Sequence, residues 1–386
     1  MNKTLKKILL AILSLVVVVV LIAGGYVGYI LLSYKRLGDM ELDITHKASL
    51  SKVETDKTYS ISTYNIGFGA YSQDFTFFLD TGYDENGNET SGTSGKATSK
   101  EEVLFNTSGS IEIMKSLDLD FMLLQEVDVK STRSYKVNQN EMFLNEFDNY
   151  DNVFSTNFDS AFLPYPILDM HGKSLSGLST FSTFSKYRFQ SAYRKEYTIS
   201  ESLSKFFDLD RCFSIQSIDV SNGKKLHIIN SHMSAYDKSG EIREKQIQEL
   251  NDCLSTLKDD YVIIGGDFNH DLLTNNPMFS YTTENRPFNN TLKDPDWVAS
   301  YFDDNNKPPL PNNYQVIASD NVPTCRNNDI AWEPGDTYTC VVDGFIVSSN
   351  ITVTTHYNIQ TNNGNLGYDG FAYSDNLPAY IEFKLK

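Results

Sequence analysis

Residues 261–269 constrain the fold of this chain more than any other segment, because they read Tyr-Val-Ile-Ile-Gly-Gly-Asp-Phe-Asn. Four β-prone apolar residues lead into two glycines, and Asp267 and Asn269 then stand two positions apart. Because side chains alternate along a strand, this pattern predicts a buried strand whose carboxyl end directs a carboxylate and an amide to one face. Such a pair can position a water molecule beside a phosphate group or a metal ion.

The N-terminal segment has the composition of a membrane span. Three lysines, Lys3, Lys6 and Lys7, precede an uncharged apolar run over residues 8–32, which is long enough to cross a bilayer. A secretory signal peptide is the alternative, but its apolar core is about 7–15 residues long and ends at a small-x-small cleavage site. The apolar run continues well past Ala23, so we predict an uncleaved anchor.

The charges around this run predict its orientation. The positive-inside rule places the lysine-rich end in the cytoplasm and the rest of the chain outside, although Lys35 and Arg36 on the far side weaken that preference. We therefore predict a single-pass protein of the cell membrane with an extracytoplasmic domain. The predicted segments are a cytoplasmic tail at 1–7, a transmembrane anchor at 8–32, a juxtamembrane linker at 33–57 and one domain at 58–386.

Overall charge narrows the class of substrate. The 386 residues carry a formal net charge of -17 at pH 7. A protein that grips duplex DNA through many phosphate contacts needs a basic face, so this balance argues against such a protein. It does not exclude a phosphoester held mainly through a bound cation. Charge and tethering favour a small molecule or a lipid head group as substrate, with an extracellular nuclease as the alternative.

Four cysteines are present, and none forms a Cys-x-x-Cys metal motif. In an oxidising exterior, Cys325 and Cys340 could close the loop between them with a disulfide. Cys212 falls in a strand pattern and Cys253 in a helix pattern, so we interpret both as core thiols.

Hydrophobic patterns predict one α/β domain with more than one sheet. Strands are expected at residues 59–66, 121–125, 261–267, 339–347 and 379–383, and a hairpin at 211–220 with 225–230. Helices are expected at 110–117 and 241–257, and a polar surface loop at 81–100.

Polar side chains stand at the ends of several of these strands. The set is Asn65, Glu126, His232, Asp267, Asn269, Asp343 and Asp375. Mg²⁺ prefers carboxylate and amide oxygens, whereas zinc sites use more nitrogen or sulfur. A single acidic residue at a strand end is most often a turn or a cap, so only the combination indicates a magnesium site.

Four motifs in this order carry a family resemblance. They are Leu-Gln-Glu-Val at Glu126, Asn-Ser-His-Met at His232, Gly-Asp-Phe-Asn at Asp267 and Asn269, and Ser-Asp-x-x-Pro at Asp375. The sequence resembles the endonuclease/exonuclease/phosphatase superfamily of deoxyribonuclease I-like metal-dependent phosphoesterases, as a membrane-anchored, bacterial-type member. The resemblance extends over the whole predicted exterior domain. It implies a four-layer αββα sandwich of two packed mixed sheets, here preceded by one N-terminal transmembrane helix.

The resemblance also implies a cofactor and its ligands. Glu126 would be the principal metal ligand, helped by Asn65 and Asp375. The implied cofactor is Mg²⁺, with Mn²⁺ or Ca²⁺ as alternatives. The implied partner is a phosphodiester or phosphomonoester substrate; nucleic acid is less favoured, and no protein partner is predicted.

The remaining motif residues receive catalytic roles from the same resemblance. Asp267 and Asn269 would orient or deprotonate the attacking water. His232 and Arg211 would bind the phosphoryl oxygens, and His232 is also a candidate to protonate the leaving group. The cation would polarise the phosphoryl group and offset the charge that develops on it.

The closing motif departs from the family pattern. The family has Ser-Asp-His, with the histidine held by the aspartate that matches Asp343, whereas this chain has Ser374-Asp375-Asn376. An amide neither takes nor gives a proton at neutral pH, and general acid–base groups contribute about 10²–10⁴-fold in rate. Three hypotheses remain: Asp267 serves as the base, His270 substitutes for the missing imidazole, or the domain is a non-catalytic binding module.

Other histidines and aromatic residues receive structural interpretations. We interpret His270 as a loop residue rather than a catalytic one, and His171 and His356 as structural or surface residues. Among the many Tyr and Phe residues, Phe162, Tyr165 and Phe181 are candidates to line a substrate cleft.

Overall fold

The computed structural model describes residues 2–45, 52–183, 187–202, 205, 210–235, 241–288 and 291–386. The helices are α1 (Lys3–Ser33), α2 (Lys100–Ser116), α3 (Gln139–Glu146) and α4 (Glu241–Thr256), with a short 3-10 turn at Gly67–Gly69. The strands up to the middle of the chain are β1 (Met40–Glu41), β2 (Ile44–Thr45), β3 (Tyr59–Asn65), β4 (Thr81–Tyr83), β5 (Glu89–Ser91), β6 (Phe121–Asp128), β7 (Tyr150–Leu163), β8 (Gly172–Thr183) and β9 (Ser191–Glu196). The later strands are β10 (Cys212–Asp219), β11 (Lys225–His232), β12 (Tyr261–Asp267), β13 (Tyr314–Ile317), β14 (Cys325–Arg326), β15 (Thr339–Cys340), β16 (Asp343–Ser348), β17 (Ile351–Asn358) and β18 (Ala379–Leu385).

Within the described part of the chain, the strands form two large mixed sheets. One seven-stranded sheet has the order β1-β9-β10-β11-β12-β16-β13, and the other has the order β17-β18-β3-β6-β8-β7-β2. Each sheet contains one parallel pair near its centre, β11 with β12 and β3 with β6, among antiparallel neighbours. The predicted α/β fold with two mixed sheets is therefore confirmed.

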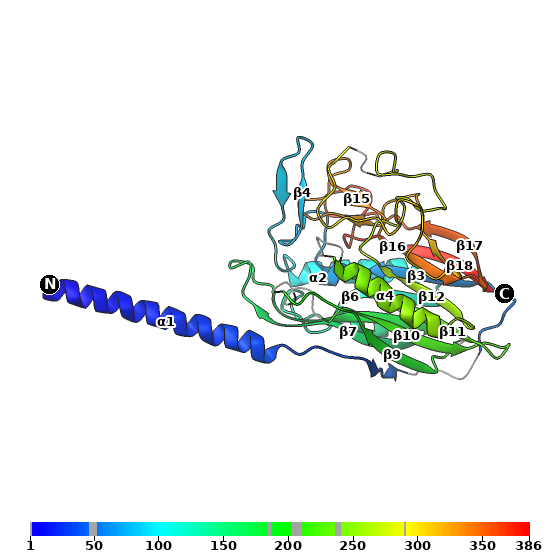
Figure 1. Cartoon of the computed structure of the whole chain (residues 1–386), viewed down its shortest axis with the longest axis horizontal. Coiled ribbons are helices and arrows are strands. Elements are labelled where there is room, and N and C mark those ends of the chain that lie inside the picture. The colour runs from blue at the N-terminus through cyan, green and yellow to red at the C-terminus, as the bar shows by residue number, and fades with distance from the viewer. Residues whose placement is uncertain are drawn as a thin grey trace.

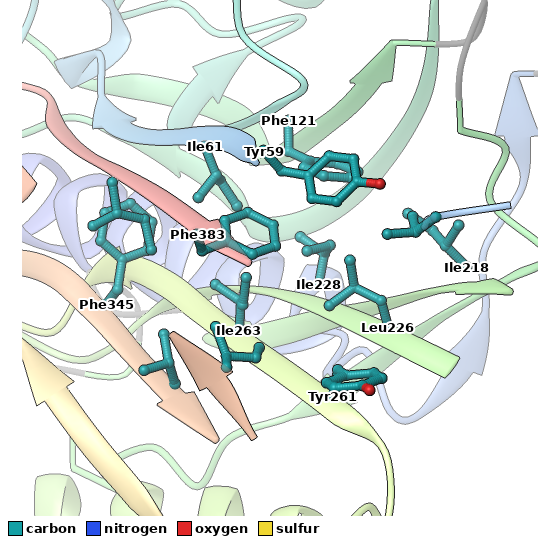
Figure 2. Packing of buried hydrophobic residues seen from close by; sticks show 14 of the residues in the cluster. Tyr59, Ile61, Phe121, Ile218, Leu226, Ile228, Tyr261, Ile263, Phe345 and Phe383 are labelled. Carbon is teal, nitrogen blue, oxygen red and sulfur yellow. The ribbon is translucent and has the colours of Figure 1, made fainter. Parts of the chain in front are cut away.

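The two sheets pack face to face through a core of fully buried apolar side chains. Tyr59, Ile61 and Phe383 from one sheet meet Ile228 and Ile263 from the other (Figure 2). These residues alternate with residues on the outer face of each strand, as expected for a sheet buried on both sides. Burial of so many large side chains stabilises the stacking of the two sheets.

Helices cover the outer faces of both sheets. Ile247 and Leu250 of α4 pack on Val262 and Ile264 of β12, and Figure 1 shows α4 lying across β11 and β12. On the second sheet, α2 and α3 bury apolar side chains against β6. The sequence of layers is therefore helix, sheet, sheet, helix.

Helix α1 has no buried residue and extends away from the sandwich (Figure 1). It is long and apolar enough to cross a membrane. The segment that follows, predicted as a linker, contributes two short edge strands, because β1 pairs with β9 and β2 pairs with β7. The exposed path between α1 and the sandwich is therefore short.

Several elements differ from their predictions. The strand predicted over residues 339–347 is two strands in different sheets, β15 and β16, separated by Val341 and Val342. The polar loop predicted over 81–100 contains the β4–β5 hairpin, and Gly82 and Gly92 within it are buried against residues 327–329 or Phe77. The long β7–β8 hairpin was not predicted. Cys325 and Cys340 are free thiols placed directly opposite each other across β14 and β15.

Candidate active site

The predicted site residues meet where the central strands of the two sheets end. In the parallel pair of β11 with β12, His232 is in register with Asp267, and across the next pair Asp267 is in register with Asp343. In the other sheet, Asn65 and Gln125 are in register at the ends of β3 and β6, one residue before Glu126. The parallel pairs thus bring the carboxyl ends of four strands to one edge of the sandwich.

Gly266 allows the close approach of strands that this edge requires. A Cβ atom at Gly266 would lie 1.9 Å from the carbonyl oxygen of Ser231 on β11, a distance that no side chain can occupy. At Gly265 a Cβ would press on Leu123 and Phe345 in the inter-sheet core. The two glycines before Asp267 are therefore needed by packing on both faces of β12.

Glu126 leaves the sheet at a local break in the β6 ladder. Its φ is 52°, in the left-handed region that a non-glycine residue rarely adopts. Pairing of β6 with β8 shifts register between Leu124 and Val127. The irregularity turns the Glu126 carboxylate toward the cavity, where the side chain is 24% exposed. Such strain and bulges are concentrated at functional sites.

The Asn65 amide holds two carboxylates together. Its Nδ2 donates to Asp267 Oδ2 at 3.0 Å and to Glu126 Oε1 at 3.3 Å. Its Oδ1 accepts from the backbone N–H of Gly67 at 3.0 Å, which fixes which end of the amide faces the carboxylates. In this orientation Asn65 positions Glu126 and Asp267, and its oxygen faces the Gly67 N–H rather than these carboxylates.

Asn376 lies between Asp343 and Asp267. Its Nδ2 donates to Asp343 Oδ2 at 2.8 Å and to Asp267 Oδ2 at 3.3 Å. Burial, reinforced by the charge of Asp267, raises the pKa of Asp343 well above its usual range. Burial also raises the pKa of Asp267, to about 6, against the opposing hydrogen bond from Asn65. Each of these two carboxyls therefore binds a proton more readily than a free aspartate does.

His232 and Arg211 face this group of carboxylates. His232 Nε2 lies 3.8 Å from Asp267 Oδ2 and 3.9 Å from Glu126 Oε1. Burial, followed by the charge of Arg211, lowers the pKa of His232 well below its usual value, so the ring is neutral. Arg211 precedes β10 and lines the same cavity as His232. Phosphoryl oxygens in this cavity could therefore contact the neutral imidazole of His232 and the guanidinium cation of Arg211.

Asp375 adds a further carboxyl group to the lining of this cavity. Asn328 donates to Asp375 Oδ2 at 2.9 Å and to Asp80 Oδ2 at 3.0 Å. Burial and the charge of Glu126 raise the pKa of Asp375 to about 8. Burial beside Glu126 therefore disfavours the ionised form of Asp375, which a divalent cation would stabilise, and this donor set of oxygens fits a hard divalent cation.

Within the described ranges, no group of three or more His, Cys, Asp or Glu side chains is arranged so that it could hold a metal ion. A cation would instead take two carboxylates, Glu126 and Asp375, and complete its shell with water and substrate. Mg²⁺ is commonly bound in this way. Asn65 would have to turn over to contribute its oxygen.

The structure brings nearly the whole predicted set to one cavity. Its walls include Asn65, Glu126, Arg211, His232, Asp267, Asn269, Asp375 and Asn376. Asp343 lies directly behind Asn376 and is fully buried. Asn269 donates its side-chain Nδ2 to the Met233 carbonyl at 2.8 Å and its backbone N–H to Asp267.

A second, aromatic cavity adjoins the first and was not predicted. It shares Glu126, Arg211 and His232 with the carboxylate cavity, and its other walls include Phe68, Tyr71, Phe77, Phe78, Phe158 and His171. Arg133 closes its inner end, where the guanidinium lies 3.8 Å from the Phe68 ring centroid and is paired with Asp128. The only sequence signal for the Arg133–Asp128 pair is Asp128 itself, which directly follows the Leu-Gln-Glu-Val motif.

The other histidines and aromatic residues singled out from the sequence lie in different parts of the domain. His270 is buried with Nδ1 2.7 Å from the Phe268 carbonyl and its ring against Tyr301, and it lines a separate hollow beside α4. It is therefore not placed to substitute for the missing imidazole. The interpretation of His171 as purely structural missed its place in the aromatic cavity. Phe181 is fully buried in the core and lines no cleft.

Comparisons with known proteins agree on the fold. A family model described as "Endonuclease/Exonuclease/phosphatase family" matches residues 103–360. The structure of D. rerio TDP2 complexed with a single-strand DNA product has 15% identity and a TM-score of 0.51, and the match covers 85% of this chain and 100% of that one. ANGEL2, a 2′,3′-cyclic phosphatase in complex with adenosine-2′,3′-vanadate, has 14% identity and a TM-score of 0.53, with 90% and 99% coverage. The human Nocturnin catalytic domain with a bound sulfate has 14% identity and a TM-score of 0.50, with 89% and 97% coverage. No curated protein sequence gives a significant match.

Proposed function

The chain belongs to the endonuclease/exonuclease/phosphatase family, and from this premise we propose that it is a membrane-tethered, metal-dependent hydrolase of phosphoric esters. The observation that carries the proposal is the meeting of Glu126, His232 and Asp267 at one edge of the sandwich. His232 Nε2 lies within 4 Å of both carboxylates, at 3.8 and 3.9 Å. A phosphoryl group placed there would contact Asp267 as a base and His232 as a nitrogen donor. It would also lie next to Glu126, a carboxylate of the proposed cation site.

The cation would be held by Glu126 and Asp375, and it would supply Lewis-acid polarisation of the phosphoryl oxygen. The protein groups have separate tasks. Arg211 and His232 bind phosphoryl oxygens on the cavity wall. Asn65 keeps Glu126 and Asp267 in fixed positions through its two hydrogen bonds.

Asp267 is the group best suited to deprotonate water. Its pKa of about 6 leaves it ionised at neutral pH yet basic enough to accept a proton. Asn376 and Asn65 donate to the same oxygen, Oδ2, while the N–H of Asn269 holds Oδ1. The carboxylate is thus oriented from three sides, and a proton taken from water remains within this buried group.

We assign α1 as a membrane anchor with the domain outside the cell membrane. The substrate is a small phosphoester or a lipid head group, because a chain with a net charge of -17 is poorly suited to hold duplex DNA. Mg²⁺ is the proposed ion, given the all-oxygen donor set.

The test uses the full-length protein in detergent micelles. Replacing Glu126 by Ala removes the chief carboxylate of the cation site, so isothermal titration calorimetry should show loss of measurable Mg²⁺ binding. Hydrolysis of bis(4-nitrophenyl) phosphate should disappear in the same variant and in wild type treated with a chelator. Glu112→Ala, which removes an exposed carboxylate on α2, is the matched control and should behave as wild type. Unchanged Mg²⁺ affinity in Glu126→Ala would refute the assignment.

A non-catalytic binding module is the second candidate, and one observation favours it. Asn376 stands where the family places a titratable histidine, and its amide is engaged with Asp343 and Asp267. A module of this kind would bind Mg²⁺ in a Glu126-dependent manner and hydrolyse none of a panel of DNA, sphingomyelin, inositol phosphates and the generic diester. Metal-dependent turnover of any of these substrates would exclude it.

A further inference from the structure

The tip of the β7–β8 hairpin exposes an unusual concentration of apolar side chains. We define the hairpin tip as residues 162–170, with the sequence Phe-Leu-Pro-Tyr-Pro-Ile-Leu-Asp-Met. Within it Tyr165 is 55% exposed, Ile167 73% and Leu168 100%, and Phe162 and Met170 are also exposed. Single exposed apolar residues are ordinary on protein surfaces, whereas a contiguous group marks an interaction site.

The one charged residue of the hairpin tip is neutralised within the domain. Asp169 accepts from the Gly95 N–H at 2.8 Å and pairs with Lys96 at 3.6 Å. Two prolines, Pro164 and Pro166, remove backbone N–H donors from the same segment. The outer surface of the tip can therefore enter an apolar medium with few polar groups to desolvate.

The hairpin tip lies beside the C-terminal turns of α1. The Tyr26 hydroxyl donates to the Phe162 carbonyl at 2.8 Å, and the Phe162 N–H donates to the Tyr29 hydroxyl at 3.3 Å. Helix α1 ends at Ser33, so at 1.5 Å per residue Tyr26 lies roughly 10 Å before its end. Tyrosines at this position are typical of the membrane–water interface. A bilayer that surrounds α1 therefore reaches the hairpin tip.

The inner side of the hairpin tip continues into the aromatic cavity. The Tyr165 ring packs edge-to-face on Phe78 with centroids 5.4 Å apart, and Phe78 and Phe158 both contact His171. These three contacted residues line the aromatic cavity, which shares Glu126, Arg211 and His232 with the carboxylate site. The cavity is narrow, with a volume of about 60 Å³, so only a small group such as a phosphoryl group would enter it.

We propose that the hairpin tip inserts into the bilayer that holds α1, and that the aromatic cavity receives the phosphodiester head group of a lipid from that bilayer. The substrate class rests on the hydrolase proposed above, whereas the insertion does not. A lipid is favoured over a protein partner because the apolar tip and the tyrosines of α1 are hydrogen-bonded together on the same side of the domain. Zwitterionic head groups suit a domain whose own charge is strongly negative.

Insertion is tested with full-length protein reconstituted into phosphatidylcholine vesicles. Leu168→Trp places an indole at the fully exposed position of the hairpin tip, and brominated phosphatidylcholine should quench the added fluorescence. Tyr357→Trp is the matched control, because Tyr357 is exposed on β17. Figure 1 shows that β17 lies at the end of the sandwich away from α1. The two native tryptophans provide a constant background. Quenching no greater in Leu168→Trp than in the control would overturn the proposal.

Substrate presentation is tested with Ile167→Asp/Leu168→Asp in vesicles of phosphatidylcholine, phosphatidylethanolamine, phosphatidylglycerol and sphingomyelin. Two carboxylates at the tip oppose insertion, so lipid hydrolysis should fall by about tenfold or more, while hydrolysis of soluble bis(4-nitrophenyl) phosphate should stay at the wild-type rate. Thr352→Asp/Thr354→Asp on β17 controls for added charge. Equal loss on both substrates, or no loss on lipid, would overturn the presentation role. Wild-type protein inactive on every substrate would overturn the hydrolase, and quenching alone would then decide insertion.

Discussion

The position of Asn376 shows how one residue changes the chemistry of the site without changing its geometry. Its amide bridges the buried carboxyl groups of Asp343 and Asp267 at 2.8 and 3.3 Å. Asp343 Oδ1 has no hydrogen-bond partner within the described residues. A ring nitrogen would reach Asp343 from the same backbone position and leave its second nitrogen toward the cavity. An imidazole at this position is therefore expected to pair with Asp343.

Asn376→His is predicted to raise hydrolysis, by about 10²-fold, because the added imidazole can exchange a proton in the reaction. The rate should acquire a pH dependence near the imidazole pKa of about 6.5. The measurement is the pH–rate profile for bis(4-nitrophenyl) phosphate in both proteins. Adding Asp343→Asn to the variant should cancel most of the gain, since the ring loses the carboxylate that orients it. An unchanged or lower rate would show that the native amide belongs to an adapted mechanism.

His171 is a buried neutral base at the edge of the aromatic cavity. Burial, followed by the charge of Arg133, lowers its pKa to about 3. Its Nδ1 has no hydrogen-bond partner within the described residues. Because the pKa in the folded state is below the value of about 6.5 in the unfolded state, this residue leaves stability unchanged above pH 6.5. As the pH falls from 6.5 toward 3, the unfolded state takes up a proton that the folded state refuses, and stability is lost.

His171→Phe is predicted to flatten the acid dependence of stability. Wild type should lose up to ~1.4 kcal/mol of unfolding free energy per pH unit below 6.5 through this residue, and the variant should not. Urea unfolding at pH 7.5 and pH 5.0 measures the difference. Phe78→Leu, which alters the same cavity without removing a titratable group, should shift stability equally at both pH values. An identical pH dependence in wild type and His171→Phe would contradict the prediction.

Among the elements, the strands with continuous apolar runs and the β10–β11 hairpin with its Asn-Gly turn were predictable from sequence, whereas β7 was not. β12 and β18 lie in the interior of their sheets and carry apolar side chains into the core, so local patterns indicated both. β7 carries Asn152 and Ser155, which are buried. Asn152 is satisfied by Ser179 of β8 at 2.8 Å. Such a partner appears only after the hairpin forms, so no local pattern could indicate β7.

The same distinction separates the predictable part of the site from the rest. Strand-end residues such as Glu126 and Asp267 follow apolar runs, and their motifs indicated a shared edge. Asn328 and Arg326 come from an irregular region around β14, and they approach Asp375 only in the folded chain. The aromatic cavity likewise draws on loops and strands distant in sequence. Local patterns therefore indicated the polar strand-end residues of the candidate site, but not the other residues that line its cavities.

Gly266→Ala is predicted to destabilise the domain by about 2 kcal/mol or more, because the added Cβ must displace β11 from β12. The clash falls on the Ser231 carbonyl at 1.9 Å, next to His232, so hydrolysis should also fall. Urea unfolding and the diester assay measure the two effects. Gly38→Ala is the control, since a Cβ there meets nothing within 4 Å. A variant as stable and active as wild type would show that the strands can separate at no cost.

At the scale of the whole molecule, the proposed anchor α1 and the aromatic cavity both adjoin the β7–β8 hairpin. Helix α1 meets the domain at the β7–β8 hairpin rather than at the far end, where β17 and the C-terminus lie (Figure 1). The Tyr165 ring of that hairpin packs on Phe78, which lines the aromatic cavity. This placement agrees with the proposed lipid substrate, which would reach the site from the bilayer.

The proposed orientation puts the domain outside, as the charges flanking α1 predict. Lys3, Lys6 and Lys7 precede the span, and Lys35 and Arg36 follow it. Proteinase K added to intact bacterial cells should therefore digest the domain and spare an N-terminal tag. Replacing the three N-terminal lysines by Glu reverses the charge difference, so a substantial share of the domains should become protected.

The matched control changes the same number of charges far from the span, at Lys130, Lys258 and Lys384, all exposed in the domain. It should leave the domain fully accessible to the protease, because the positive-inside rule counts charges close to the membrane. A wild-type domain protected in intact cells would place the site in the cytoplasm and contradict the orientation. A tag lost together with an accessible domain would indicate that α1 does not span the membrane at all.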